Sequence, residues 1–323
     1  MPPAPDGGNG AAHHAPSLSL VVPTYNESTR LADGLDRLRA AAREGALDLG
    51  ATELVIVDDG STDDTLAIAR GLATQFPVAR VVALPRNEGK GAAVRRGLLT
   101  ARGTKVVFAD ADMAIDPTLL PSMLDALDRA HVAVGSRAVR GHVDYGTRLR
   151  TGAGRAFNLA VRGLGGVRLA DTQCGFKGFR LGAARLLAQL LTTPGYAFDV
   201  ELLWLADRLD LDVEVVPVTW LDVPGSSVRV ARDSLEMLRD VLAARRRAHL
   251  VAAATIDGDV PAPAPEGTVV VRGGRTTMLC GSVEQLAELR RATGDGRAPR
   301  LLTLDDLAGL RPLELEPAAG SQP

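Results

Sequence analysis

The chain has 323 residues, a length that predicts about two domains, and 46% of its residues are apolar. Lys plus Arg (37) nearly balances Asp plus Glu (39), which argues against a protein that coats nucleic acid with its whole surface. Two cysteines exclude a disulfide framework, and no apolar run approaches the roughly 18 residues of a membrane-spanning helix. We therefore expect a cytoplasmic location, no transmembrane helix and no nucleic-acid partner.

From residue 17 onward, short β-branched runs alternate with apolar residues at helical spacing. The strands are expected at residues 17–23, 53–57, 78–84 and 105–109. Ser61 and Asp64 have the spacing of a capping box, which predicts that a helix starts there, and Pro117 suits the first turn of another helix. Single helices between strands predict an α/β fold with a doubly wound, mostly parallel sheet.

Polar clusters follow three of the predicted strands at the points where those strands end. The clusters read PTYNE at residues 23–27, DDGS at residues 58–61 and DAD at residues 110–112. In a doubly wound sheet, ligands bind outside the carboxyl ends of the parallel strands. We therefore expect these three clusters to meet in one site.

Asp110 and Asp112 stand two residues apart at a strand end, so their carboxylates are expected on the same side. Paired carboxylate oxygens suit Mg²⁺ or Mn²⁺, with phosphate oxygens completing the shell of the metal. The alternative is that both aspartates serve the turn before the helix at Pro117. The two similar clusters upstream favour the metal site over this alternative.

The other clusters offer groups that suit a nucleotide, each with a plain structural alternative. Asp58 could accept hydrogen bonds from a base and a ribose, or its segment could be a turn with Ser61 as a cap. Tyr25 beside Glu27 could stack on a nucleobase, or both could lie in a polar loop. Lys90, at a predicted helix N-terminus, could contact a phosphate or be an exposed lysine in a Gly-rich turn.

The second half of the chain begins with residues 137–168, which hold seven Arg, one Asp and no Lys or Glu. This stretch could line a groove for phosphorylated ligands or form a solvated helix face. A helix over residues 199–209, a strand over residues 212–220 and a basic amphipathic helix over residues 232–249 are expected to follow. The basic helix could lie on an anionic membrane surface or pack against the domain.

Composition also predicts how the chain divides. Residues 1–16 are rich in Pro, Gly and Ala and lack the features of a signal peptide, which predicts a disordered tail. Residues 17–250 are expected to form one α/β domain, and residues 251–267, which include PAPAPEG, a linker. Residues 268–323 are expected to form a small α+β module and tail, with two strands around a Gly273-Gly274 turn.

Taken together, the motifs resemble a known family. PTYNE, DDGSTDDT, NEGKGAAVRRG and DADMA, in that order, resemble the family 2 glycosyltransferases of the GT-A fold. The segments DTQCGFKGF at residues 171–179 and YAFDVELLWLA at residues 196–206 resemble the dolichyl-phosphate β-glucosyltransferase group, to which polyprenyl-phosphate glycosyltransferases are near relatives. The resemblance covers residues 17–250, whereas DDGS and DAD alone are shared by the whole superfamily.

This resemblance implies an inverting transfer of a hexose, with glucose favoured, from a nucleotide sugar, with UDP-glucose favoured. The implied acceptor is polyprenyl or dolichyl phosphate, which requires a transient contact with a membrane surface. The implied location is the cytoplasm, with peripheral binding at the inner face of the membrane, and the implied cofactor is Mg²⁺ or Mn²⁺.

The resemblance and the residue chemistry above together assign candidate roles. The donor nucleotide would contact Pro23, Tyr25, Glu27, Asp58, Asp59, Lys90, Asp110 and Ala111. The metal would bind Asp110 and Asp112, and catalytic roles would fall to Asp199, Glu201 and Arg137. The acceptor phosphate would contact Arg150, Arg155, Lys177 and Arg229. Because a phosphate monoester is largely dianionic near neutrality, Asp199 is expected to orient a hydroxyl or the acceptor rather than to accept a proton.

Two positions depart from the family pattern. Ala114 stands where mannose synthases have a glutamine, so water or phosphate would complete the metal shell. Ser227 stands where the glucosyl group has a lysine, and Arg229 is the nearest substitute, although an arginine two residues away is not equivalent to that lysine.

Two other functions remain alternatives. The first is a transferase of the same fold that uses a non-lipid acceptor, which the missing membrane helices favour. The second is a non-catalytic nucleotide-sugar-binding protein with the C-terminal module as its output, which the intact aspartates of DDGS and DAD disfavour. A nucleotidyltransferase is opposed by the DTQCGFK segment.

Overall fold

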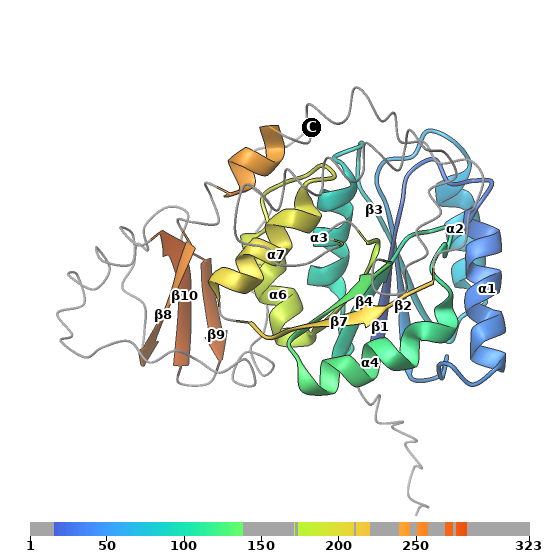
Figure 1. Cartoon of the computed structure of the whole chain (residues 1–323). Coiled ribbons are helices and arrows are strands. Elements are labelled where there is room, and N and C mark those ends of the chain that lie inside the picture. The colour runs from blue at the N-terminus through green and yellow to red at the C-terminus, as the bar shows by residue number, and fades with distance from the viewer. Residues whose placement is uncertain are drawn as a thin grey trace, which may run out of the picture.

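The computed structural model describes residues 16–137, 171, 174–209, 211–219, 239–245, 251–257, 269–273 and 276–282. Nearly all of the expected N-terminal tail and of the arginine-rich stretch, and the whole chain after residue 282, lie outside these residues. So do Arg150, Arg155, Ser227 and Arg229. The described residues form a seven-stranded sheet with helices on both faces and a second, three-stranded sheet (Figure 1).

The seven-stranded sheet is mixed and mostly parallel, as predicted. Its strands are β1 (Leu18–Thr24), β2 (Thr52–Asp58), β3 (Val78–Ala83), β4 (Lys105–Ala109), β5 (Val132–Ser136), β6 (Phe176–Arg180) and β7 (Val213–Pro217). In space they run in the order β3-β2-β1-β4-β6-β5-β7. β1 pairs in parallel with β2 and β4, whereas β6 runs antiparallel to β4 and β5. Every residue of β1 and β2 is buried, as central strands between two helix layers require.

Helices cover both faces of this sheet (Figure 1). They are α1 (Leu31–Arg43), α2 (Thr65–Ala73), α3 (Lys90–Thr100), α4 (Leu120–Arg129), α6 (Leu181–Leu190) and α7 (Phe198–Arg208). The sheet divides the apolar core in two. Val94 and Leu98 of α3 pack with α6 and α7 against one face, and Leu35 of α1 and Met123 of α4 pack against the other.

The start of α2 differs from the capping-box prediction. The helix begins at Thr65, with Asp64 as the N-cap residue and no side-chain cap. Ser61 does not cap it, because the Ser61 hydroxyl oxygen accepts a hydrogen bond of 3.0 Å from the Asn26 amide of the loop after β1. Asp63 accepts from the Thr65 amide instead, at 3.0 Å. The DDGS and PTYNE segments are therefore tied to each other, and the Glu27 amide also donates to the Thr65 hydroxyl at the start of α2, at 2.8 Å.

Pro117 stands where the sequence predicts it. It opens a short 3-10 turn, η1 (Pro117–Leu119), that leads directly into α4. The Asp116 carboxylate caps this turn by accepting a hydrogen bond of 2.9 Å from the Thr118 amide. The chain that follows the DAD cluster is thereby turned away from the sheet edge.

The second sheet is antiparallel, with the order β8-β10-β9. Its strands are β8 (Val251–Asp257), β9 (Val269–Gly273) and β10 (Thr276–Ser282), and the last two are the strands expected around Gly273-Gly274. The expected linker is wrong in its first part, because residues 251–257 form a strand that pairs with β10. The rest of the proposed domain division stays a prediction.

Residues 239–245 are helical, inside the range expected for the basic helix. Val241 and Ala244 are fully buried, whereas the Leu242 side chain is 42% exposed, so this helix has one face against the protein. Within the described residues, no helix is long and apolar enough to cross a membrane.

Candidate active site

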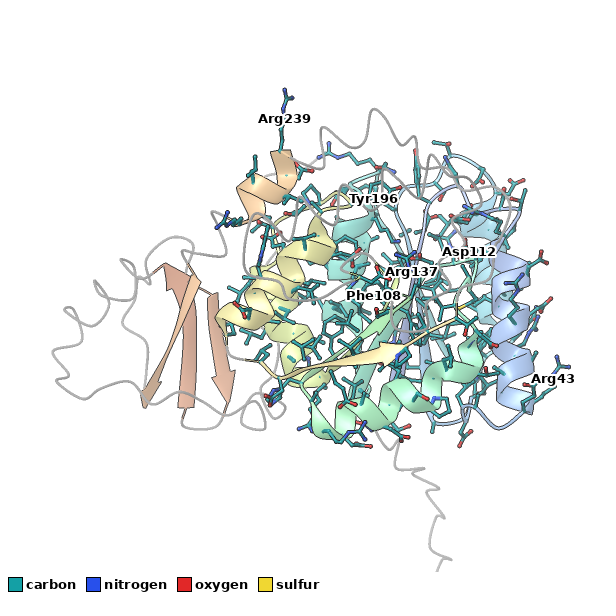
Figure 2. The ribbon with its side chains drawn as sticks, viewed as in Figure 1. Arg43, Phe108, Asp112, Arg137, Tyr196 and Arg239 are labelled. Carbon is teal, nitrogen blue, oxygen red and sulfur yellow. The ribbon has the colours of Figure 1, made fainter. Side chains whose placement is uncertain are left out.

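The three polar clusters meet in one cavity of about 460 Å³ beyond the carboxyl ends of β1, β2 and β4. All of the expected donor-side residues except Asp58 line this cavity, together with Asp112 and Arg137. The cavity is also lined by Arg30 and Tyr196, two residues to which the sequence assigned no role. Figure 2 shows Asp112, Arg137 and Tyr196 at the same end of the sheet.

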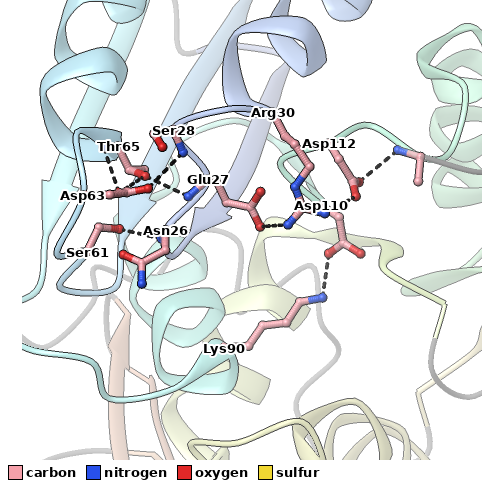
Figure 3. A network of polar contacts seen from close by, with 11 residues as sticks. Asn26, Glu27, Ser28, Arg30, Ser61, Asp63, Thr65, Lys90, Asp110 and Asp112 are labelled. Carbon is pink, nitrogen blue, oxygen red and sulfur yellow. Dashed lines mark hydrogen bonds and ion pairs between the residues drawn. The ribbon is translucent and has the colours of Figure 1, made fainter. Parts of the chain in front are cut away.

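Asp110 and Asp112 extend from the end of β4 into a set of alternating charges (Figure 3). The Lys90 ammonium lies 2.6 Å from Asp110 Oδ1. The Arg30 guanidinium bonds Glu27 at 2.7 Å and lies 3.5 Å from Asp112 Oδ2. Glu27, Asp110 and Asp112 each have a cation beside them.

These neighbours decide how the groups ionise. Burial raises the pKa of the Asp112 carboxyl, and the negative charge of Asp110 raises it further. Burial also raises the pKa of Glu27, although Arg30 opposes this. For Lys90, burial would lower the pKa, but the charges of Asp110 and then Asp199 raise it, so Lys90 is a cation at neutral pH.

A divalent cation fits the donor chemistry of Asp110 and Asp112. Both supply hard carboxylate oxygens, and the repulsion that raises the pKa of Asp112 is what a bound cation would relieve. No group of three or more acidic, His or Cys side chains is arranged for a metal within the described residues. The protein would therefore supply these two carboxylates, and phosphate or water oxygens the other ligands.

The loops that carry the clusters have unusual backbone conformations. Asn26, after β1, has φ of 52°, and Met113, after β4, has φ of 44°; both are in the left-handed region. The Asn26 carboxamide oxygen accepts a hydrogen bond of 2.9 Å from the Thr62 amide, which fixes that loop. The Asp112 carboxylate accepts from the Ala114 amide at 3.1 Å, which fixes the other. Such backbone strain is typical of functional sites.

Asp58 and Asp59 differ in their hydrogen-bond partners. One oxygen of Asp58 accepts a hydrogen bond of 3.1 Å from the Ser61 amide, and the other, Oδ1, is buried without a partner among the described residues. Both oxygens of Asp59 accept backbone hydrogen bonds of 2.8 Å, from Glu88 and Gly89. Burial raises the pKa of Asp59, and these hydrogen bonds oppose that effect. Asp59 thus fixes the turn before Lys90.

Arg137, at the end of β5, is tied to Asp171, a residue that received no role from the sequence. Its Nε and Nη2 donate to the two oxygens of Asp171 at 2.7 and 2.9 Å, and its amide donates at 3.1 Å. Burial would raise the pKa of Asp171, but the hydrogen bonds and charge of Arg137 lower it. Arg137 therefore reaches the cavity in an orientation set by a buried carboxylate.

Three expected site residues, Lys177, Glu201 and Asp199, are placed differently from their assigned roles. Lys177 was assigned to the acceptor phosphate, yet it is fully buried in β6, where its Nζ bonds Asp199 Oδ1 at 2.5 Å and the Cys174 carbonyl oxygen at 2.8 Å. Glu201 was assigned a catalytic role, yet it is 1% exposed and its carboxylate faces the loop before α7. Neither lines the cavity, and the same holds for Asp199, so none of the three is in a position to contact a ligand there.

Residues 19–187 match the family described as Glycosyl transferase family 2. The chain belongs to this family. It is 34% identical over 252 residues to the dolichyl-phosphate beta-glucosyltransferase of Saccharomyces cerevisiae, covering 71% of this chain and 74% of the relative. It is 35% identical over 243 residues to the human protein of the same name, covering 71% and 75%. The protein is thus a glycosyltransferase similar to dolichyl-phosphate beta-glucosyltransferases, and the resemblance stated from its motifs is confirmed.

A solved structure of Mycobacterium tuberculosis glucosyl-3-phosphoglycerate synthase, in complex with Mn²⁺, UDP-glucose and phosphoglyceric acid, has the same architecture. It is 25% identical with a TM-score of 0.50, over 80% of this chain and 84% of the synthase. A second structure of that synthase, with phosphoglyceric acid, is 23% identical with a TM-score of 0.52 and shows the likeness of fold. The predicted GT-A class is thereby confirmed.

Proposed function

We propose that this protein transfers a hexose, with glucose favoured, from UDP-glucose to a polyprenyl or dolichyl phosphate with inversion at the anomeric carbon. The observation that carries the proposal is the convergence of Tyr25, Asp59, Lys90, Asp110 and Arg137 on one cavity at the carboxyl edge of the sheet. The similarity of this chain to relatives named for this activity supports the choice of substrates.

The nucleoside half of the donor would lie at the ends of β1 and β2. The Tyr25 side chain is 43% exposed at the cavity, which leaves its ring face available for a base. Asp58 is 1% exposed and does not line the cavity, so the base contact expected for it from the sequence is not part of this proposal.

The diphosphate would lie between Asp110, Asp112 and the cations around them. Mg²⁺ or Mn²⁺ held by Asp110 and Asp112 would neutralise charge on the diphosphate. Lys90 and Arg137 would add two further positive charges where negative charge develops as the bond to the sugar breaks. The M. tuberculosis synthase bound to Mn²⁺ and UDP-glucose supports this donor and metal.

The acceptor phosphate is the nucleophile and needs little activation, since its second pKa of about 6 leaves it largely dianionic near neutrality. This agrees with the state of Asp199, whose carboxylate is 5% exposed and bonded to the Lys177 ammonium. Asp199 does not line the cavity, so it is not placed to accept a proton from an acceptor bound there.

The test is transfer of label from radioactive UDP-glucose to polyprenyl phosphate, measured in the organic phase after extraction. Asp112→Asn should reduce transfer at least about 100-fold, because it removes one metal ligand. The matched control is Asp116→Asn, four residues along, where the aspartate only caps η1. No lipid-linked label, with any nucleotide sugar, refutes the acceptor; full activity of D112N refutes the metal assignment.

A second candidate is transfer to a water-soluble phosphorylated acceptor. It is favoured by the synthase that holds UDP-glucose and phosphoglyceric acid together, and its fold matches 80% of this chain. Adding phosphoglyceric acid to the same assay separates the two, because its glucosylated product stays in the aqueous phase. Peripheral binding to the membrane belongs to the lipid acceptor alone and would be measured by sedimentation with anionic vesicles.

A further inference from the structure

The segment between α6 and α7, residues 191–197, forms part of the cavity wall; we call it the α6–α7 loop. Its Gly195 and Tyr196 line the cavity, and the Tyr196 side chain is 40% exposed there. We propose that Glu201 is a positioning residue: it holds the α6–α7 loop against the first turn of α3, which sets where Tyr196 and Lys90 stand. This inference rests on the proposed function and deepens it.

Glu201 is connected to the loop by both of its carboxylate oxygens. Oε1 accepts a hydrogen bond of 2.8 Å from the Thr192 hydroxyl, and Oε2 accepts one of 2.7 Å from the Thr193 amide. The Thr192 amide adds weaker contacts at 3.3 and 3.4 Å. Glu201 is 1% exposed, so these bonds stand in place of water around a buried charge. Charge-assisted bonds of this kind fix the geometry of the loop.

The α6–α7 loop is in turn hydrogen-bonded to α3, the helix that carries Lys90. The Pro194 carbonyl oxygen accepts hydrogen bonds from the amides of Gly91 and Ala92, at 2.7 and 3.2 Å. These are donors of the first turn of α3, which have no acceptor within the helix itself. The fit is close, because a Cβ on Gly91 would stand 2.4 Å from the Thr193 carbonyl oxygen. The chain on either side of Lys90 is therefore held, by Asp59 before it and by Pro194 after it.

The hydrogen bonds between Pro194 and α3 also affect where the Lys90 charge lies in the cavity. Lys90 reaches Asp110 at 2.6 Å from a helix turn whose position the α6–α7 loop sets. Tyr196 stands on the same loop and lines the same cavity as Lys90. A shift of the loop would therefore move the Lys90 cation and the Tyr196 ring together.

Hydrogen exchange of the full chain tests the connection without relying on activity. In Glu201→Gln, the Thr193 amide and also the Gly91 and Ala92 amides should exchange about tenfold faster, the effect of losing one hydrogen bond. The matched control is Glu53→Gln at the opposite end of the sheet. Glu53 is also fully buried, and it bonds the Ser19 hydroxyl and the Arg102 amide at 2.5 and 2.9 Å.

A milder pair of variants covers the case in which Glu201→Gln does not fold. Thr192→Val removes the hydroxyl that donates to Glu201, and Thr192→Ser retains it. We expect Thr192→Val to speed exchange at the α3 amides and Thr192→Ser to leave it unchanged. In the transfer assay, Glu201→Gln and Thr192→Val should lower kcat about tenfold. The dissociation constant for uridine, which lacks the diphosphate placed beside Lys90, should stay within about twofold, because the proposed nucleoside contacts lie at the ends of β1 and β2.

Three results overturn the inference: exchange that changes at Thr193 but not at Gly91 and Ala92, the same change in Glu53→Gln, or the expected exchange with an unaltered kcat. If the wild-type protein transfers no sugar to any acceptor but the exchange changes as expected, the connection through the loop stands and the proposed function fails.

Discussion

Replacing Lys177 by methionine tests how much the ion pair beneath the cavity stabilises the fold. Lys177 is fully buried, and its ammonium bonds Asp199 Oδ1 at 2.5 Å and the Cys174 carbonyl oxygen at 2.8 Å. Lys177→Met keeps an unbranched apolar stem but leaves the Asp199 carboxylate without its direct partner. Removing one member of a buried pair costs about 3–5 kcal/mol. We expect that decrease in the free energy of unfolding, measured by urea titration.

The decrease should depend on pH through Asp199. Burial raises the pKa of the Asp199 carboxyl, and the charges of Lys177 and then Lys90 oppose the rise. A raised carboxyl pKa favours the folded state at low pH, and this contribution is lost as the pH rises through the folded-state pKa. Without Lys177 the pKa rises further. Lys177→Met should therefore cost less stability near about pH 4 than near about pH 8.

Lys105→Met is the matched control, because Lys105 pairs with Asp128 at the surface, where the two side chains are 22% and 65% exposed. A pair of this kind contributes about 0–1 kcal/mol. The double variant of Lys177→Met with Asp199→Asn removes both charges, so its loss should fall short of the sum of the single losses by about 1–3 kcal/mol. Equal urea midpoints for Lys177→Met and Lys105→Met, or strictly additive losses, refute the reasoning.

Gly89→Ala should lower the free energy of unfolding by about 1–3 kcal/mol and also lower transfer, because φ of Gly89 is +104° and a Cβ would stand 2.4 Å from the Pro194 carbonyl oxygen. The control in urea titrations is Gly71→Ala, because a Cβ there meets nothing within 4 Å. Arg137→Gln should lower the free energy of unfolding near neutral pH, and this loss should vanish as the pH falls below about 4. The reason is that Arg137 holds the pKa of Asp171 below its usual value, although burial alone would raise it. A loss of stability that persists in acid contradicts this. EDTA should abolish transfer and Mn²⁺ restore it, so transfer that survives chelation excludes the metal.

The location of the site was predictable from the sequence because it follows from a rule about sheets. PTYNE, DDGS and DAD each come directly after a buried run, and parallel strands end at one edge. The register of β1 with β2 and β4 brings these ends together, as the rule requires. Residues within a cluster need no long-range information, so the lining of the cavity by Tyr25, Glu27 and Asp110 was foreseeable.

The errors concern residues whose partners are distant in the chain. A lysine such as Lys177 is expected at the surface or at a phosphate, and only the antiparallel insertion of β6 between β4 and β5 buries it. Ser61 has the spacing of a cap, but the Asn26 amide, 35 residues away, is its donor. The partner of Arg137, Asp171, follows a long arginine-rich stretch, and a pairing across it has no local signal.

Exposure separates the ion pairs of this site into two kinds. The side chains of Lys90 and Asp110 are 27% and 39% exposed at the cavity, so a donor phosphate can replace the carboxylate as the partner of Lys90 at little cost. The side chains of Lys177 and Asp199 are 0% and 7% exposed, and separating them would leave two buried charges without partners. We infer that the cavity exchanges the Lys90 pair for ligand contacts during binding while the Lys177 pair stays closed. In this proposal the exposed pair contacts the ligand, whereas the buried pair holds the first turn of α7, the helix that also carries Glu201.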